Sequence, residues 1–423
     1  MTGWVTTSTG ELLEHGVIEI GDGYRAKNAE FVESGGLPFV RVGDVSGTIR
    51  TEGIDELPIW NAEKYGAKVS QPFDSLITMK GTVGRVAYVS RGIRAFVYSP
   101  QVSYWRSRDH SRIQPRWLRY WLESSEFLSQ ALATKGATDM ADYINLRDQR
   151  RMRITVPPIL IQRKIAAVLS VYDDFIENNN RRIKILEEMA QRIYREWFVD
   201  YRYLGHQSES MVDSELGPIP LGWEVRTLGD LVDINSNTIR KVTSDEEIRY
   251  IDIASVSPGV VQAPKKMLLS EAPGRARRRV KSGDILWSTV RPNLRAYALV
   301  LSPGSDCVAS TGFAVLSPRD ASFAYVYEMT TTDAFVEYLI GRATGSAYPA
   351  VTPRVFANAP AIIPPSVVNR VFADVAEPLM QLVSHLRTQS TNLRTARDLL
   401  LPRLMSGEID VTDLDIAMRE AAA

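Results

Sequence analysis

Two stretches of the chain place apolar residues alternately four and three positions apart. In the first stretch these positions run from residue 165 to residue 197 and read Ile, Leu, Tyr, Ile, Asn, Ile, Leu, Ala, Ile and Trp. In the second they run from residue 372 to residue 404 and read Phe, Ala, Leu, Val, Leu, Ser, Leu, Arg, Leu and Leu. A mean spacing of about 3.5 residues is typical of a coiled-coil seam. The pattern therefore predicts two long helices, each about 50 Å in length at about 1.5 Å per residue.

Three residues bear on the continuity of the second helix. Pro378 and Pro402 lie inside the pattern, and a proline removes a backbone donor and clashes with the preceding turn. We expect each of them to kink or break this helix. Gly407 lies just beyond the pattern and is expected to end the helix.

The two helices belong to a longer internal repeat. The segment VPPILIQRKIA at 156–166 returns as IPPSVVNRVFA at 363–373, an offset of 207 residues. Further upstream, FVRVGDV at 39–45 matches YIDIASV at 250–256, and both segments alternate as strands do. The sequence therefore predicts a tandem duplication, in which about 150 residues of short strands and turns precede each long helix.

Two amphipathic helices in one chain can bury their seams against each other. We expect an antiparallel pair in which the numbers of opposed residues sum to 569, with the globular parts at opposite ends. That register places Asn179 opposite Ser390 and Tyr172 opposite Arg397, so that polar seam residues mostly face one another. Parallel helices, a register shifted by a heptad, or two helices of an ordinary helical domain are the alternatives. The expected seam core consists of Leu169, Tyr172, Ile176, Asn179, Ile183, Leu186, Val383, Leu386, Ser390, Leu393 and Arg397.

Composition limits the class of protein. The chain has 423 residues, 44% of them hydrophobic, and a single cysteine, Cys307. We find no run of apolar residues long enough to span a membrane and no secretory signal pattern at the start, so we expect a protein without a membrane segment. A single cysteine excludes a disulfide framework and suits the cytoplasm, with Cys307 as a small core residue.

Charge is balanced overall but uneven along the chain. There are 50 basic and 50 acidic residues, yet residues 80–120 and 265–295 each carry nine positive charges. Two basic patches within a neutral total are compatible with nucleic-acid binding. In the segment 106–121, by contrast, the aromatic residues are spaced as the buried side of a helix, so the arginines there are expected mainly to flank a core.

No catalytic or metal-binding constellation stands out. KGTVGR at 80–85 lacks the Gly-Lys-Ser/Thr ending of a P-loop, and no GxGxxG follows a predicted strand. Four histidines occur, dispersed and without metal-ligand spacing. We therefore expect a binding protein that has no catalytic residues, no metal and no cofactor of its own.

Two turns at corresponding places in the repeat carry candidate DNA-binding side chains. KGTVGR at 80–85 and STVRPNLR at 288–295 each follow a predicted strand, and they differ although the framework around them repeats. Arginine can form paired hydrogen bonds with guanine, and asparagine with adenine, so this difference is what two readers of different DNA half-sites would show. TKGAT at 134–138 and ATGSA at 343–347 are matching loops before each double proline.

From these turns, loops and their surroundings, a set of DNA-binding residues is predicted. A turn that only reverses the chain is the alternative at each position. The predicted residues are Lys80, Thr82, Arg85, Arg91, Arg94, Lys135, Thr138, Ser288, Thr289, Arg291, Asn293, Arg295, Thr344, Ser346 and Tyr348.

Three segments resemble the specificity subunit of type I restriction-modification systems. Residues 156–198, which begin VPPILIQRKIA and end QRIYREWF, resemble the central conserved region of that family. GPIPLGWEVRTLGDL at 217–231 resembles the entry to its second target recognition domain, and residues 363–409 resemble its distal conserved region. The resemblance covers essentially the whole chain.

The resemblance implies an α+β fold. Two mixed α/β target recognition domains would be separated by two long antiparallel coiled-coil helices, in a pseudo-two-fold tandem duplication. The implied borders are 1–152 for recognition domain 1, 153–204 for spacer helix 1, 205–357 for recognition domain 2, 358–410 for spacer helix 2 and 411–423 for a C-terminal tail.

The resemblance also implies a function and partners. Each recognition domain would bind one half of a bipartite, asymmetric target in double-stranded DNA, and the helices would set the gap and dock two copies of a methyltransferase subunit. S-adenosylmethionine, ATP and Mg would be needed only by partner subunits, including a restriction subunit that translocates and cleaves DNA. This chain would be non-catalytic. The alternatives are a coiled-coil scaffold, a DNA-binding module of another defence complex without methylation, or an enzyme with an unrecognised motif.

Overall fold

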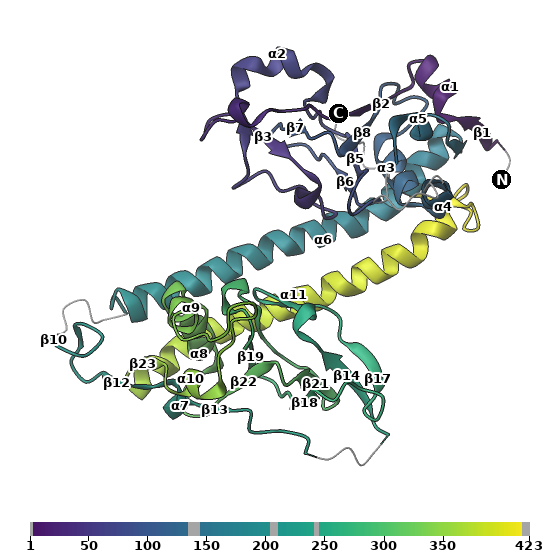
Figure 1. The fold of residues 1–423 in the computed structure, drawn as a ribbon. Helices are drawn as coiled ribbons and strands as arrows, with labels where there is room; N and C mark the ends of the chain where they lie inside the picture. The colour runs from purple at the N-terminus through teal and green to yellow at the C-terminus, as the bar shows by residue number, and fades with distance from the viewer. Residues whose placement is uncertain (1–2, 134–143, 204–209, 241–244, 417–423) are drawn as a thin grey trace. The chain divides into compact units, whose positions relative to one another are not determined.

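The computed structural model describes residues 3–133, 144–203, 210–240 and 245–416. These residues form two compact units: unit 1 comprises Met1–Glu177 and Ser390–Ala423, and unit 2 comprises Asn178–Gln389. Two long helices, α6 (Ile159–Tyr194) and α11 (Ser366–Met405), each contribute residues to both units (Figure 1). Each unit therefore consists of one globular domain and a part of each long helix. Among the described residues, no helix is long and apolar enough to cross a membrane.

In the globular domain of unit 1, the first and last strands pair with each other. Its elements are β1 (Val5–Ser8), α1 (Thr9–Glu14), β2 (Ile18–Asp22), β3 (Leu37–Val40), β4 (Glu56–Leu57), α2 (Ala62–Tyr65), β5 (Ser75–Thr78), β6 (Val86–Tyr88), β7 (Val97–Tyr98), β8 (Val102–Ser107), α3 (Pro115–Glu123), α4 (Ser125–Ala133), α5 (Leu146–Gln149) and β9 (Arg153–Val156). One sheet has the order β2-β8-β5-β6 and a second has the order β4-β3-β7. The first strand, β1, pairs antiparallel with the last strand, β9.

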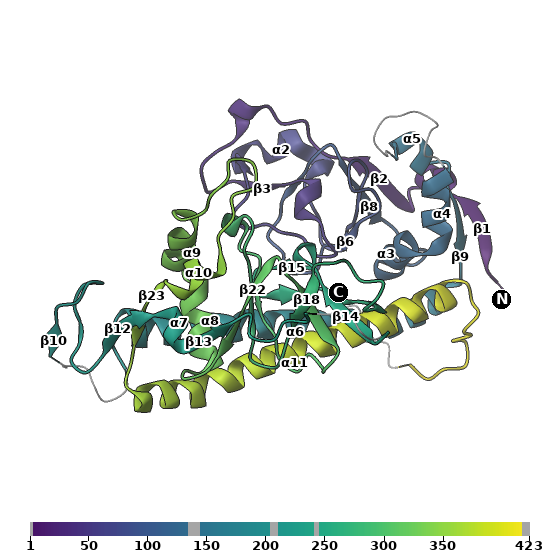
Figure 2. The same cartoon turned by 60° about the horizontal axis from the view of Figure 1, so that its bottom comes forward.

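Unit 2 repeats this arrangement. Its elements are β10 (Met211–Val212), β11 (Ile219–Pro220), β12 (Glu224–Thr227), α7 (Leu228–Leu231), β13 (Val232–Ile234), β14 (Glu247–Ile251), β15 (Val256–Ser257), β16 (Val260–Val261), β17 (Lys265–Leu268), β18 (Ala276–Arg279), β19 (Ile285–Ser288), β20 (Tyr297–Leu299), β21 (Cys307–Ser310), β22 (Phe313–Pro318), α8 (Phe323–Thr331), α9 (Asp333–Ile340), α10 (Pro353–Ala357) and β23 (Pro360–Ile363). The sheet β13-β22-β19-β20 corresponds to β2-β8-β5-β6. Strand β12 pairs with β23 as β1 does with β9, and Figure 2 labels both pairs.

Individual hydrogen bonds are also repeated at corresponding places in the two units. Asp74, one residue before β5, accepts from the backbone N–H of Gln71 at 2.7 Å, and Asp284, one residue before β19, accepts from that of Lys281 at 2.8 Å. In the second sheet, β3 runs parallel to β7 as β14 runs parallel to β21. The predicted tandem duplication and the mixed α and β fold class are therefore confirmed.

A polar residue four positions after each double proline forms hydrogen bonds between a long helix and its globular domain. In unit 1, Gln162 is fully buried, accepts from the backbone N–H of Gln114 at 2.9 Å and donates to the Pro157 carbonyl at 2.9 Å. In unit 2, Asn369 accepts from the backbone N–H of Ser322 at 3.4 Å. Gln114 and Ser322 are the N-cap residues of α3 and α8. The repeated motif therefore joins two helices in each unit.

The helix predicted from the aromatic spacing in 106–121 is present as α3. Pro115 occupies its first turn, and the Gln114 side chain accepts from the Trp117 backbone N–H, so the helix start is well defined. Trp117, Tyr120 and Trp121 are fully buried, and Trp121 packs against Trp105 of β8 with ring centroids 5.6 Å apart. Burying large side chains of this kind contributes about 1.5–3 kcal/mol each.

The long helices pair antiparallel within each unit. In unit 1, Ile165 and Leu169 of α6 share a core with Leu401 and Leu404 of α11. In unit 2, Trp197, in the π-helical turn Arg195–Val199 after α6, packs against Phe372 with ring centroids 5.9 Å apart and the rings tilted by 57°. The numbers of this last pair sum to 569, the register expected from the sequence.

Polar residues of the seam form hydrogen bonds between α6 and α11, as the sequence predicted. Each partner lies one position away from the residue expected. Asn179 donates to Gln389 at 3.1 Å in unit 2, and Arg397 donates to Asp173 at 2.6 Å in unit 1. All the predicted seam residues are buried or half-buried: Leu169, Tyr172, Ile176, Asn179, Ile183, Leu186, Val383, Leu386, Ser390, Leu393 and Arg397.

The expected break in the second helix is wrong. α11 runs without interruption through Pro378 and Pro402 and ends at Met405, and Gly407 follows in the left-handed region with φ 74°. A proline inside a helix costs about 3 kcal/mol, but the seam residues on both sides of Pro378 are buried and hold the helix in place. Pro402 lies in the last turn, where fewer hydrogen bonds depend on it.

A buried carboxyl in unit 2 makes stability depend on pH. Burial raises the pKa of Glu328 on α8 to about 8, and the negative charge of Glu187 on α6 adds to this effect. Tyr327, Tyr297 and Arg387 surround the Glu187 and Glu328 carboxyls. Between about pH 4.5 and about pH 8 the group is protonated in the folded protein but ionised in the unfolded chain, so its contribution to stability falls as pH rises.

Replacing Glu328 with glutamine should remove this loss. We expect the variant to gain about 1–3 kcal/mol of unfolding free energy relative to the parent near pH 8, and much less near pH 5. Thermal unfolding of both proteins at the two pH values measures the difference. A gain of equal size at both pH values would contradict the protonation of Glu328 in the folded protein.

Candidate nucleic-acid interface

The predicted turn after β19 has an unusual backbone. Arg291 and Arg295 adopt φ values of 50° and 53°, in the left-handed region, on either side of the 3-10 turn Pro292–Leu294. Non-glycine residues rarely adopt this conformation, and such residues cluster at functional sites. Here the conformation leaves Arg291 and Asn293 exposed to solvent.

A second loop that the sequence placed among the candidates lies directly beside this turn. The backbone N–H of Arg291 donates to the Pro349 carbonyl at 2.7 Å, and that of Val351 donates to the Thr289 carbonyl at 2.8 Å. Thr344 and Ala350 exchange two backbone hydrogen bonds of 2.9 Å, which close the loop. The turn 289–295 and the loop 344–351 therefore form one surface, which we call the unit 2 reading surface.

The centre of the unit 2 reading surface is an arginine over an aromatic ring. The Arg291 guanidinium lies 4.5 Å from the centroid of Tyr348, whose side chain is 68% exposed. Arg291 also donates to the Ala347 carbonyl at 3.3 Å. Stacking orients the planar guanidinium without neutralising its charge, which leaves donors for a phosphate or a guanine edge.

Not every predicted residue of this surface is accessible. Ser288 is fully buried and donates to the Val290 carbonyl at 2.8 Å, so the prediction of a direct contact is not supported for this side chain. Thr289 is half-buried and donates to the Gly312 carbonyl at 2.9 Å. Arg295 pairs with Asp333 of α9 at 2.5 Å, which partly neutralises it. Thr344 and Ser346 are exposed.

The sequence did not single out one arginine that lies near this surface. The Arg275 carbonyl accepts from the backbone N–H of Thr311 at 2.7 Å. The carbonyl of the next residue, Gly312, accepts from the Thr289 N–H at 2.8 Å, which connects Arg275 to the turn. Arg275 is exposed and lies in the second basic window of the sequence, but nothing in that window distinguished it from Arg277, Arg278 and Arg279.

Unit 1 has a corresponding surface at 79–85. Gly81 and Gly84 adopt positive φ values of 82° and 90°, which a tight turn of this kind requires. Ile144 donates to the Met79 carbonyl at 3.1 Å, in the place of the Val351 to Thr289 bond of unit 2. Lys80, Thr82 and Arg85 are exposed in this turn, whereas the candidates Lys135 and Thr138 lie outside the described residues.

Two further predicted residues of unit 1 have partners within the protein. Arg91 lies 5.1 Å from the ring centroid of Phe73 and stays exposed. Arg94 pairs with Glu56 at 2.7 Å and also donates to the Gly36 carbonyl. Its charge is therefore balanced, and a role in holding β4 fits Arg94 better than a DNA contact.

The arginines of α3 serve the long helices. Arg119 pairs with Asp173 of α6 at 2.8 Å, and Arg116 pairs with the adjacent Asp174 at 3.1 Å. Asp173 also accepts from Tyr120 at 2.7 Å and pairs with Arg397 of α11 at 2.6 Å. Burial would raise the pKa of Asp173, but Arg119 and the hydrogen bonds outweigh it, so the pKa is lowered. The preference for a structural role of these arginines is supported.

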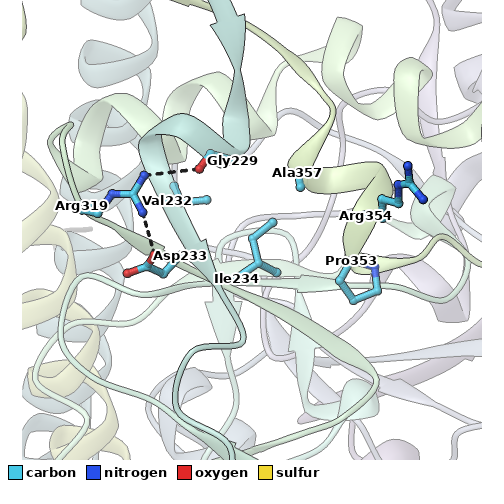
Figure 3. Close-up of a pocket in the computed structure, with 8 residues that line it drawn as sticks. All are labelled: Gly229, Val232, Asp233, Ile234, Arg319, Pro353, Arg354 and Ala357. Atoms are coloured by element: carbon cyan, nitrogen blue, oxygen red, sulfur yellow. Dashed lines mark hydrogen bonds and ion pairs between the residues drawn. The ribbon is translucent and has the colours of Figure 1, made fainter.

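A cavity of about 410 Å³ in unit 2 offers no catalytic constellation (Figure 3). It lies between α7, β13 and α10, and Arg319 at its rim donates to Asp233 at 2.9 Å and to the Asp230 carbonyl at 2.9 Å. The Asp233 carboxylate in the lining is paired with Arg319, and the third charged residue of the lining, Arg354, is a guanidinium that stays protonated, so the cavity pairs no acid with a base for proton transfer.

The chemistry of metals and thiols is equally sparse. Among the described residues, no group of three His, Cys, Asp or Glu side chains could hold a metal ion. Cys307 is buried in β21, and burial raises its thiol pKa to about 11, so the thiolate that would react is disfavoured. Within the described part of the chain, the two exposed basic turns are the features best suited to a ligand.

Comparisons with known proteins point in one direction. Residues 2–188 match the family model described as type I restriction modification DNA specificity domain. The chain is 25% identical over 271 residues to the type I restriction enzyme MjaIX specificity subunit of Methanocaldococcus jannaschii, which covers 63% of this chain and 62% of that protein. It is 21% identical over 399 residues to the putative type I restriction enzyme MjaX specificity subunit of the same organism, which covers 89% and 88%.

The fold has a solved counterpart. The crystal structure of the type I restriction-modification system S subunit from M. genitalium matches with a TM-score of 0.58 and 14% identity, over 95% of this chain and 96% of that one. At this identity the likeness concerns the fold. The chain spans just under two thirds of the MjaIX specificity subunit that it matches. The predicted resemblance to type I specificity subunits is confirmed.

Proposed function

We propose, because residues 2–188 match the family model described as type I restriction modification DNA specificity domain, that the chain is the DNA-recognition subunit of a type I restriction-modification complex. The observation that carries the proposal is the reading surface of unit 2, with an exposed arginine stacked on an exposed tyrosine. A turn with exposed Lys80, Thr82 and Arg85 occupies the same place in unit 1.

Two reading surfaces in one chain fit a bipartite target. The turns differ in sequence and in backbone conformation, since unit 1 uses glycines where unit 2 uses left-handed arginines. The frameworks that hold them are alike. Each domain would therefore bind one half of an asymmetric site in double-stranded DNA, and the paired helices would fix the gap between the halves.

Methylation and cleavage would come from partner subunits. The chain would act without a cofactor of its own, and S-adenosylmethionine, ATP and Mg would serve only a methyltransferase and a restriction subunit. The helices have outward apolar residues that suit such docking: Val171 and Phe175 of α6 are exposed, as are Pro378 and Leu382 of α11 exactly one repeat later. An exposed pair on each helix is compatible with two copies of one partner.

Selection of DNA by the purified chain tests the proposal. A pool of duplexes with random sequence should yield one bipartite motif, and affinity should fall steeply between low and moderate salt because phosphate contacts release counterions. Sequencing of modified bases in the native genome should show methylation at the same motif. A coiled-coil scaffold predicts neither a motif nor a steep salt dependence, so their absence would favour that alternative.

Arg291 should determine specificity in one half of the motif. We expect Arg291→Ala to lower affinity for the preferred base pair by about 1–3 kcal/mol and to leave the other half-site unchanged. Selection with the variant measures this, and Arg85→Ala in unit 1 is the matched variant that should relax the other half. Equal loss of affinity for every sequence would mean that Arg291 contacts phosphate instead of a base.

A further inference from the structure

Three elements of unit 2 meet at one arginine that the reading surface does not include. Arg387 of α11 donates through Nη2 to the Glu187 carboxylate of α6 at 2.5 Å. Through Nη1 it donates to the Gly259 carbonyl at 2.5 Å. Gly259 is the tip of the hairpin formed by β15 and β16. One guanidinium thus binds both long helices and the recognition domain, in a group that we call the Arg387 joint.

The hairpin tip fits the joint closely. Gly259 is buried and has φ 71°, and a Cβ placed on it would lie 3.2 Å from the Tyr327 hydroxyl and 3.5 Å from Arg387. A side chain at this position would therefore be strained by its backbone and crowded by its neighbours. The tip is held by geometry as well as by the hydrogen bond.

The Arg387 joint is connected to the reading surface by a backbone hydrogen bond to a residue close to the reading turn in sequence. The backbone N–H of Gly259 donates to the Tyr297 carbonyl at 2.9 Å. Tyr297 begins β20, two residues after Arg295, the last residue of the reading turn. Its ring packs 6.2 Å from Tyr327 and 5.0 Å from Trp287, which lies on β19 just before the turn. Both strands that carry the turn are thus tied to the joint.

The described residues of unit 1 do not form this arrangement. Its hairpin between Val45 and Ile49 has a glycine tip in the same place, Gly47, with φ 79°. A Cβ placed on Gly47 would meet no atom within 4 Å, and Ser46 and Thr48 beside it are exposed. At the repeat offset of 207 residues, Arg387 corresponds to Asn180 and Glu187 corresponds to Arg394. An asparagine and an arginine do not reproduce the ion pair of Arg387 with Glu187.

We propose that the Arg387 joint is a positioning device, which fixes the reading turn of unit 2 against the helix pair and thereby sets how strictly the protein selects the gap between its half-sites. The proposal rests on the proposed function. Arg387 and Glu187 touch no base in this role. They act through the hairpin tip and β20, so they govern the placement of the turn and not the bases that it selects.

Gap selectivity is therefore the readout. The motif selected by the parent protein is built into duplexes with the native gap and with gaps one base pair shorter and longer, and affinity for the full chain is measured. Coupling between two sites of a protein is typically worth a factor of about 5–150. Arg387→Met should reduce the preference for the native gap by about 5-fold or more, and the bases preferred within each half-site should not change.

Matched variants separate the joint from general strain. Arg387→Lys retains a charge that can reach Glu187 or Gly259 and should restore part of the selectivity. Gly259→Ala should loosen gap selection as Arg387→Met does, because it displaces the tip. Gly47→Ala introduces a comparable backbone strain in unit 1 without a contact to disturb and should leave gap selection at the parent level.

The outcomes distinguish the joint from the function on which it rests. If the parent selects a bipartite motif but folded Arg387→Met and Gly259→Ala keep its gap preference, the joint is not a positioning device and the proposed function stands. Equal relaxation by Gly47→Ala would also overturn the role of the joint. A parent protein that selects no motif at all would remove the proposed function and, with it, this inference.

Discussion

Asp173→Ala should lower the free energy of unfolding of unit 1 by about 2–4 kcal/mol, because two largely buried guanidiniums lose the carboxylate that they share. Arg119 would keep only Glu123 as a partner, and Arg397 would keep only the exposed Asp398. The Asp173 carboxylate lies between Arg119 of α3 and Arg397 of α11, and side-chain exposures are 14% for Asp173, 11% for Arg119 and 19% for Arg397. It also accepts the Tyr120 hydroxyl, which is otherwise buried. Helices α3 and α11 would therefore lose their common partner on α6.

The neighbouring carboxylate is the control. Asp174 pairs with Arg116 at 3.1 Å, but its side chain is 47% exposed, and exposed ion pairs contribute about 0–1 kcal/mol. Asp174→Ala should therefore change the unfolding free energy by less than about 1 kcal/mol. Chemical denaturation of the parent and both variants at neutral pH measures the difference. Similar losses for the two variants would show that Asp173 does not join the helices.

The pH dependence of Asp173 has a defined sign. Its pKa is lowered in the folded protein, so its contribution is complete above the ordinary range of an aspartate and is lost as pH falls below that range. The difference between the parent and Asp173→Ala should therefore shrink in acid. This trend is opposite to that of Glu328, whose raised pKa makes its effect grow toward about pH 8.

On the proposed function, insertion of one heptad into both long helices should change the gap between the two DNA half-sites. Seven helical residues add about 10.5 Å, which corresponds to about three base pairs at about 3.4 Å each. Duplication of 170–176 together with 393–399 keeps the observed seam, because Asp173 and Arg397 lie within the duplicated segments and pair with each other. We expect a motif with the same bases in each half and a longer gap.

Insertion into one helix only is the control for the heptad experiment. It would move seam residues out of register with their partners, so we expect a destabilised protein that selects no single gap. Selection from random duplexes reads both results. An unchanged gap after the paired insertion would show that the helices do not set the spacing.

The sequence predicted the helices and the repeat better than it predicted the site. A heptad pattern states directly which side chains are buried, and the seam from Leu169 to Arg397 followed it. The effect of Pro378 was overestimated, because a local rule ignores the packing on both sides of the proline. The repeat located both turns, because the two similar frameworks each carry a turn at the corresponding place, although the turns differ in sequence and in backbone conformation.

Contacts between distant residues account for what the sequence did not show. Ser288 was predicted to contact DNA, but it is buried at the end of β19. Arg94 was predicted to contact DNA too, but it pairs with Glu56, which lies 38 residues earlier in the sequence. The joining of the turn 289–295 with the loop 344–351 depends on backbone hydrogen bonds across about 60 residues, which no local pattern encodes.

The pairing of the first and last strands has a consequence for how such proteins diversify. β1 pairs with β9 and β12 pairs with β23, so the first and last strands of each globular domain form a two-stranded antiparallel ribbon. The last strand of each ribbon ends directly before a double proline. Genetic crossover at these two points would exchange a whole domain as a cassette, with its internal pairing intact and the host helices untouched. On the proposed function, such an exchange would produce a new combination of half-sites without stepwise change in either core.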